Sequence, residues 1–121
     1  MKLKHLFFPV MAFVLISFGS ASCKKSNDTS PADNPGPNEV FMKDNLFTPN
    51  NLTVKLGTTV KWTNKGAITH TATSNDGGAT FNSGNVTPGQ SFSYTTTTAG
   101  TFQYQCTIHG AAMSGTLTVT P

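Results

Sequence analysis

The chain has 121 residues, of which 36% are apolar and 11% charged. This length is enough for one ordinary domain and excludes a two-domain enzyme. Twenty threonines, eleven glycines and seven prolines favour short strands and turns over an all-helical bundle. All eight basic residues are lysines, and beyond residue 22 six lysines stand against five acids, so we expect no nucleic-acid partner.

Residues 1–22 have the composition of a secretory signal peptide. A lysine-bearing start is followed by an apolar stretch from Leu6 to Phe18 and then by small residues up to Cys23. This stretch is too short to cross a bilayer core, which requires about 20 residues in a helix. We therefore expect an exported chain without a permanent transmembrane helix.

The small residues that run into Cys23 resemble the lipobox of bacterial lipoproteins, with Ser20 standing where leucine is usual. The resemblance implies that Cys23 is acylated and anchors the chain to a membrane of the cell envelope, facing the periplasm or at the surface. The alternative is an ordinary cleaved signal in which Cys23 is incidental. With Cys23 as the anchor, residues 23–38 are expected to form a disordered tether of about 20 Å, because they contain three prolines and no large apolar group.

Residues 39–121 are expected to form one all-β domain. Apolar and polar residues alternate there with the period of two that is typical of half-buried strands, and turn sequences such as Lys65-Gly66 separate the runs. The pattern predicts a Greek-key β-sandwich of seven to eight strands, over residues 39–44, 51–56, 58–64, 68–74, 79–82, 90–97, 100–106 and 114–120. The predicted core consists of Val40, Leu52, Val54, Val60, Trp62, Phe92, Tyr94, Phe102, Tyr104, Leu117 and Val119, with Met42 beside it.

Four side chains carrying sulfur or imidazole are expected to meet at one end of this sandwich. Cys106 lies on the inward face at the end of its predicted strand, and His109 and Met113 follow in the next loop. His70 is the only other histidine after residue 22. Two imidazoles and one thiolate with a weak axial thioether describe a blue-copper centre, whereas structural zinc requires four strong ligands. The set predicts one copper ion.

Each of the four also has an ordinary structural explanation. A cysteine at a strand end is often a small buried hydrophobe, histidines can lie in a core or on a surface, and a methionine can fill space. Their joint placement favours a metal site. An exported domain with two cysteines ordinarily forms a disulfide, but an acylated Cys23 would leave Cys106 without a partner, and copper would protect its thiol.

The segments FTPNNLTVKLGTTVKWTNKG, THT and YQCTIHGAAMSGTLTV resemble the cupredoxins, specifically the plastocyanin, pseudoazurin and amicyanin branch. The resemblance covers about residues 40–120. It implies that copper is bound by His70, Cys106, His109 and Met113 and that the protein is a one-electron carrier. It also implies that an edge of His109 reaches the surface, where a flat apolar patch would dock transient redox partners. The residues of this patch are Gly110, Ala111 and Ala112.

Two features depart from that family's pattern. Thr71 stands where the best-known members have an asparagine that braces the ligand loop, which leaves the bracing and the redox potential open. Three residues separate His109 from Met113, one more than in amicyanin-like loops and one fewer than in plastocyanin-like loops. The sequence therefore does not fix the axial distance.

The expected function is one-electron transfer by a copper protein tethered in the bacterial cell envelope. The main alternative is a lipoprotein that uses the same ligands to sequester or deliver copper, and a third is an adhesive or structural β-sandwich without metal. An enzyme is disfavoured, because four protein ligands leave copper no open position for a substrate, and no nucleophile with a base or pair of carboxylates stands out.

Overall fold

The protein is described by a computed structural model that covers residues 34–121. The predicted signal peptide, the predicted acylation site Cys23 and most of the predicted tether lie outside the described residues. In the part that is described, no helix is long and apolar enough to cross a membrane.

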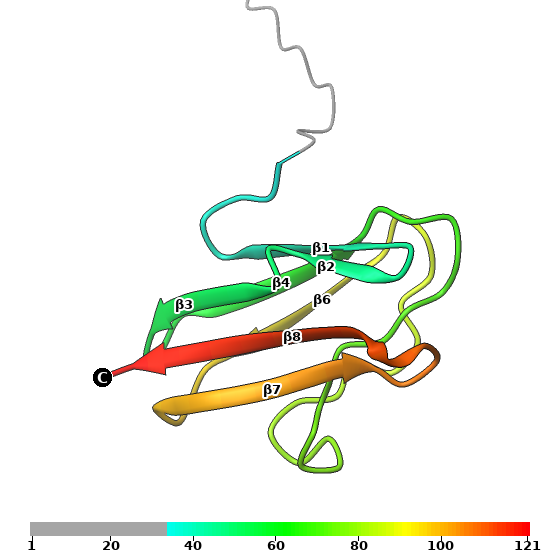
Figure 1. Cartoon of the computed structure of the whole chain (residues 1–121). Coiled ribbons are helices and arrows are strands. Elements are labelled where there is room, and N and C mark those ends of the chain that lie inside the picture. Colours follow the sequence, from blue (N-terminus) through cyan, green and yellow to red (C-terminus); the bar gives the residue numbers. More distant parts are fainter. Residues whose placement is uncertain (1–33) are drawn as a thin grey trace, which may run out of the picture. The chain divides into compact units, whose positions relative to one another are not determined.

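Residues 39–120 fold into two four-stranded sheets that pack face to face (Figure 1). Their strands are β1 (Glu39–Lys43), β2 (Leu46–Thr48), β3 (Asn51–Lys55), β4 (Thr59–Asn64), β5 (Thr73–Ser74), β6 (Ser91–Thr95), β7 (Gly100–Cys106) and β8 (Gly110–Thr120). One sheet has the order β2-β1-β4-β6 and the other the order β3-β8-β7-β5. The predicted all-β sandwich of seven to eight strands is confirmed.

The strand predictions fail where the strands are short or the backbone is irregular. Strand β2 was not predicted, because it has three residues and follows a tight turn in which Asn45 adopts a φ of 67°. The strand predicted over residues 68–74 shrinks to β5, and His70 makes only an isolated bridge to Val86. No strand forms over residues 79–82, where Asn82 makes an isolated bridge to Thr73.

The core between the sheets is built on aromatic rings. Trp62 of β4 is fully buried, with its ring centroid 5.6 Å from that of Tyr104 on β7 and 5.1 Å from that of Phe81. The predicted core residues at its margin are only partly buried; they are Leu52, Phe92, Tyr94 and Phe102. The period of two missed buried residues that lie in loops or in the three-residue strand β2; they are Phe47, Ala72, Phe81 and Val86.

Tyr104 is held in this core by close contact with β8. A Cβ atom added at Gly115, its cross-strand partner, would fall within 3 Å of the Tyr104 ring, so the ring occupies the space above the glycine. The Tyr104 hydroxyl and the Trp62 Nε1 are buried and make no hydrogen bond. Burial raises the pKa of Tyr104 to about 12, against a smaller opposing effect of the Trp62 indole.

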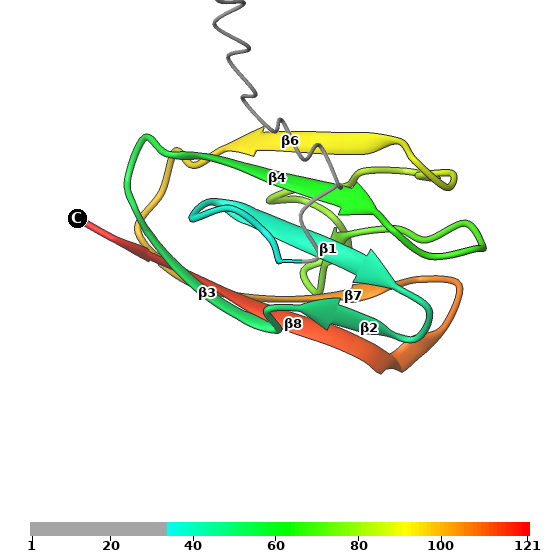
Figure 2. The ribbon, with the colours of Figure 1, turned by 90° about the horizontal axis from the view of Figure 1, so that it is seen from above.

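The strand directions give the sandwich two different ends. β1 runs parallel to β4, so both finish at the same end, where β7 also ends and β8 begins. Figures 1 and 2 show that the chain enters β1 and leaves β8 at the opposite end. Loops from both sheets therefore meet where β1, β4 and β7 finish.

A prediction concerns the turn after β5, which is closed by Asp76. The Asp76 carboxylate accepts hydrogen bonds from the hydroxyls of Ser74 and Thr80 and from the Ala79 amide at 3.0 Å, and these bonds lower its pKa from 3.8 to about 2. The ionised group therefore stabilises the fold above about pH 4, and this contribution disappears as the pH falls towards 2. We expect Asp76→Asn to lower the urea midpoint of unfolding at pH 7 more than at pH 2.5. Equal losses at both pH values would contradict this.

Candidate metal centre

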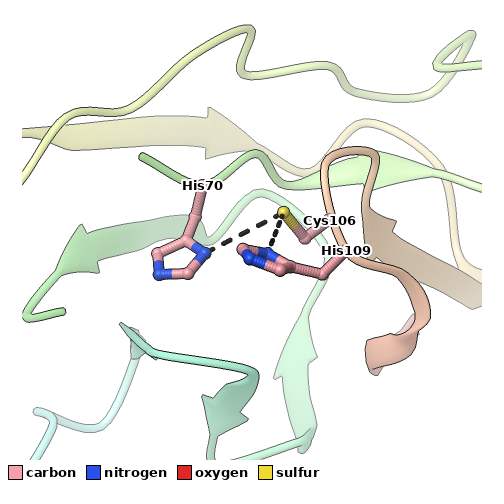
Figure 3. A group of neighbouring side chains, drawn as sticks. All are labelled: His70, Cys106 and His109. Atoms are coloured by element: carbon pink, nitrogen blue, oxygen red, sulfur yellow. Dashed lines mark hydrogen bonds between the residues drawn. The ribbon is translucent and has the colours of Figure 1, made fainter. Parts of the chain in front are cut away.

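His70, Cys106 and His109 lie together at the end of the sandwich where β1, β4 and β7 finish. Their potential ligand atoms are all within 4.8 Å of one another. Cys106 Sγ is 3.3 Å from His109 Nδ1 and 3.9 Å from His70 Nδ1, and Figure 3 shows both nitrogens turned towards the sulfur. The structure thus brings three of the four predicted ligands into one cluster.

The three side chains are placed by different pieces of backbone. Cys106 is the last residue of β7 and is fully buried, whereas His109 lies in the turn before β8 and is half-buried. Gly110 closes this turn with a φ of 62°, a conformation that glycine adopts without strain. His70 lies between β4 and β5 and is fixed by a pair of backbone hydrogen bonds with Val86, of 3.1 and 2.8 Å.

The fourth predicted ligand, Met113, is a fully buried residue of β8. It belongs to the same buried apolar cluster as Cys106. Its side chain is therefore shielded from water on the strand that follows His109 directly.

The predicted docking patch lies at the surface. Ala111 and Ala112 are exposed and Gly110 is half-buried. The structure adds Ile108 and Ile68, which are 52% and 46% exposed and stand next to His109 and two residues before His70. Sequence reasoning missed these isoleucines, although each lies within two positions of a predicted ligand.

Thr71 connects the two loops that carry the ligands. Its hydroxyl accepts a hydrogen bond from the Thr107 amide at 2.9 Å and lies 3.1 Å from the hydroxyls of Thr107 and Thr73. Its own amide donates to Cys106 Sγ at 3.4 Å. The sequence left the bracing at this position open, and the structure shows that the threonine hydroxyl supplies it.

A carboxylate that the sequence analysis did not identify contacts the outer nitrogen of His70. Asp44, in the turn between β1 and β2, places Oδ1 3.2 Å from His70 Nε2, and the same oxygen accepts the Ala67 amide at 3.0 Å. The hydrogen bond with His70 lowers the pKa of Asp44. No local signal predicts this contact, because the two residues are 26 positions apart in the chain.

Asn64, at the end of β4, organises the loop that leads to His70. Its fully buried amide donates to the carbonyls of Ile68 and Val86, both at 2.8 Å, and its Oδ1 accepts the Gly66 amide at 2.8 Å. These bonds satisfy the backbone groups of a loop that has no strand partner. The sequence analysis missed this residue too, since a polar side chain at the end of a strand is usually solvated.

The donor set fits a copper ion. Thiolate sulfur suits Cu(I), and imidazole nitrogen suits both oxidation states, whereas magnesium and calcium prefer oxygen ligands. A structural zinc site would need a fourth strong ligand. In residues 34–121 the cluster contains one thiol and two imidazoles, with the buried thioether of Met113 on the adjoining strand. This is the ligand chemistry of a blue-copper site.

Comparisons with known proteins agree with this chemistry. The family model described as "Cupredoxin-like domain" matches residues 10–119. The chain is 36% identical to plastocyanin from Scenedesmus fuscus over 84 residues, which are 61% of this chain and 86% of that protein.

Solved structures give the same picture. An oxidised amicyanin variant matches with a TM-score of 0.62 and 30% identity, covering 68% of this chain and 80% of amicyanin. The copper-containing nitrite reductase of Thermus scotoductus matches with a TM-score of 0.64 and 30% identity, covering 72% of this chain but only 23% of that enzyme.

The bracing by Thr71 gives a prediction about stability. Thr71→Val preserves the shape of the side chain but leaves the Thr107 amide without its partner. We expect the free energy of unfolding of the metal-free protein to fall by about 1–2 kcal/mol, measured by urea titration. Thr71→Ser keeps the hydroxyl and is the matched control, so it should retain most of the stability. Equal stability of the valine variant and the native protein would contradict the bracing role.

Proposed function

The chain belongs to the cupredoxin-like family, and on that basis we propose that it is a type 1 (blue) copper protein that carries one electron at a time in the bacterial cell envelope. The main support is the cluster of His70, Cys106 and His109, whose ligand atoms lie within 4.8 Å of one another. It is the ligand set expected for blue copper, formed at one end of a sandwich whose relatives include a plastocyanin.

In this proposal His70 and His109 would hold copper through Nδ1, Cys106 through Sγ, and Met113 through its thioether sulfur. When bound, copper supplies a centre that gains and loses a single electron. The chain keeps the donors in place during this change. Cys106 is fixed by β7, and the Thr71 hydroxyl ties the loop that follows it to the loop of His70. Donors held in one arrangement require little rearrangement between oxidation states, which favours fast transfer.

Electrons would pass through the exposed side of the centre at His109. The segment from Thr107 to Met113 contains no lysine, aspartate or glutamate, and Ile108, Ala111 and Ala112 expose apolar groups around the half-buried histidine. Such a surface suits small, short-lived contacts with redox proteins of the envelope. The match to nitrite reductase covers only 23% of that enzyme, so its activity is not part of the proposal.

We also propose that the protein is an exported lipoprotein, attached to a membrane through acylated Cys23 and a tether that ends at residue 38. The supporting observations are the signal-like residues 1–22 and the small residues before Cys23. The described fold begins at Glu39, so the tether would join the sandwich at the end opposite the metal centre.

The first prediction of this proposal is optical and chemical. The copper-loaded protein should be intensely blue because of thiolate-to-copper charge transfer, and Cys106→Ser should be colourless. The native copper protein should also retain its copper in both oxidation states when it is challenged with a Cu(I) chelator. Loss of Cu(I) to the chelator would favour copper delivery instead of electron transfer, and a colourless native protein holding one copper would exclude a blue site.

Met113→Gln serves as the companion variant in the same experiment. It should keep the copper and the colour but lower the reduction potential, because the axial ligand tunes that potential. Unchanged voltammetry would show that Met113 is not the axial ligand.

The attachment is tested by Cys23→Ser in the native host. The variant should move from the membrane fraction to the soluble fraction or remain as unprocessed precursor, and the intact mass of the native protein should include the acyl chains. A native mass that shows a disulfide between Cys23 and Cys106 would contradict both the anchor and the free thiol.

A further inference from the structure

We propose that Asp44 is a positioning residue of the metal centre: its carboxylate holds His70 with Nε2 protonated and Nδ1 free to bind metal, and its charge lowers the reduction potential. The effect on the reduction potential rests on the proposed copper function. The position and tautomer of the His70 imidazole can be tested without metal.

Because His70 is buried, its ring nitrogens can find hydrogen-bond partners only within the protein. The residue is fully buried, and its two ring nitrogens face different groups: Nδ1 lies 3.9 Å from Cys106 Sγ, and Nε2 lies 3.2 Å from Asp44 Oδ1. A carboxylate accepts hydrogen bonds and does not donate them, so the nitrogen facing it carries the proton. Nδ1 then keeps its lone pair on the side of the cluster.

The backbone holds Asp44 in position from two sides. Asp44 and Asn45 form the turn between β1 and β2, where Lys43 pairs with Leu46. The Lys65 amide donates to the Met42 carbonyl at 2.9 Å, which fixes the end of β1 against the start of the His70 loop. The Ala67 amide donates to the same carboxylate oxygen that contacts His70. Asp44 therefore joins the β1–β2 turn to the ligand loop.

The space around the pair depends on Gly66. A Cβ atom added there would collide with the Asp44 carboxylate and lie 3.0 Å from His70 Nε2. Gly66 does not have a positive φ, so backbone conformation does not require glycine at this position. The missing side chain instead leaves the room in which the carboxylate and the imidazole meet.

The chemistry of such a pair affects both affinity and potential. A carboxylate on the outer nitrogen fixes the orientation and tautomer of a ligating histidine and increases its basicity. Its negative charge also stabilises the more highly charged Cu(II) relative to Cu(I), which lowers the potential. The Asp44 side chain is 46% exposed, so solvent screens part of this charge. Lys65 does not pair with it, because its ammonium lies over the Phe41 ring, 5.1 Å from the centroid.

The experiment compares Asp44→Asn and Asp44→Ala with a charge-matched control, Glu39→Gln. Glu39 is at the other end of β1, about 16 Å from Asp44 at the rise of an extended strand. Asparagine keeps an oxygen that can accept a hydrogen bond from Nε2–H but removes the charge. Alanine removes both.

We expect Asp44→Asn to raise the reduction potential, with up to about a tenfold change in the ratio of Cu(II) to Cu(I) affinity, or about 59 mV for one electron. Asp44→Ala should raise it too and weaken copper binding by about 10- to 100-fold in chelator competition. Glu39→Gln should change neither quantity. A potential in Asp44→Asn that matches the control would overturn the electrostatic role.

Nitrogen NMR of the metal-free protein tests the positioning role by itself. His70 should be the Nε2–H tautomer in the native protein and in Asp44→Asn, and a mixture of tautomers or a mobile ring in Asp44→Ala. An unchanged His70 spectrum in a folded Asp44→Ala variant would overturn positioning. If Asp44→Ala does not fold, the native tautomer decides, since an Nδ1–H form contradicts the proposal. A native protein that shows the Nε2–H tautomer but never takes up copper would refute the proposed function and leave positioning intact.

Discussion

The metal centre depends on the packing of Trp62 against Tyr104 across the sandwich. These two residues come from different sheets, and each stands two positions before a residue that shapes the centre. Asn64 follows Trp62 on β4 and closes the His70 loop, and Cys106 follows Tyr104 at the end of β7. The ring contact, with centroids 5.6 Å apart and planes at 87°, therefore joins the two sheets close to the positions of these two residues.

His70 and His109 have different surroundings, and each is therefore suited to a different role. His70 is fully buried, and its outer nitrogen is bound by Asp44, so this side of the centre is suited to adjusting the metal. His109 is half-buried in an uncharged loop of small and apolar residues, so this side is suited to contact with another protein. A single cluster can thus be tuned from one side and reached from the other.

The sequence predicts the parts of this molecule that follow a local rule. Alternating apolar residues reveal β3, β4, β6 and β7, because half-buried strands need one apolar face. Cys106 and His109 stand close together in the chain, and His70 is picked out because few other ligands are available. The three-residue strand β2 is not predicted and β5 is predicted too long, since two or three residues cannot show a period. The contact of Asp44 with His70 is equally hidden, because it depends on the pairing of β1 with β4, which is known only once the sheet is formed.

The place where the chain enters the sandwich has a further consequence. Residues 36–39 form a small turn, closed by the Glu39 amide donating to the Gly36 carbonyl at 3.1 Å, immediately before β1 at the pole remote from the metal. Any cargo joined to this pole, such as a fusion partner or a linker to an electrode, would leave the face around His109 uncovered. The architecture therefore offers a natural orientation for attaching the protein to a support, with the pole that carries His70, Cys106 and His109 directed outward.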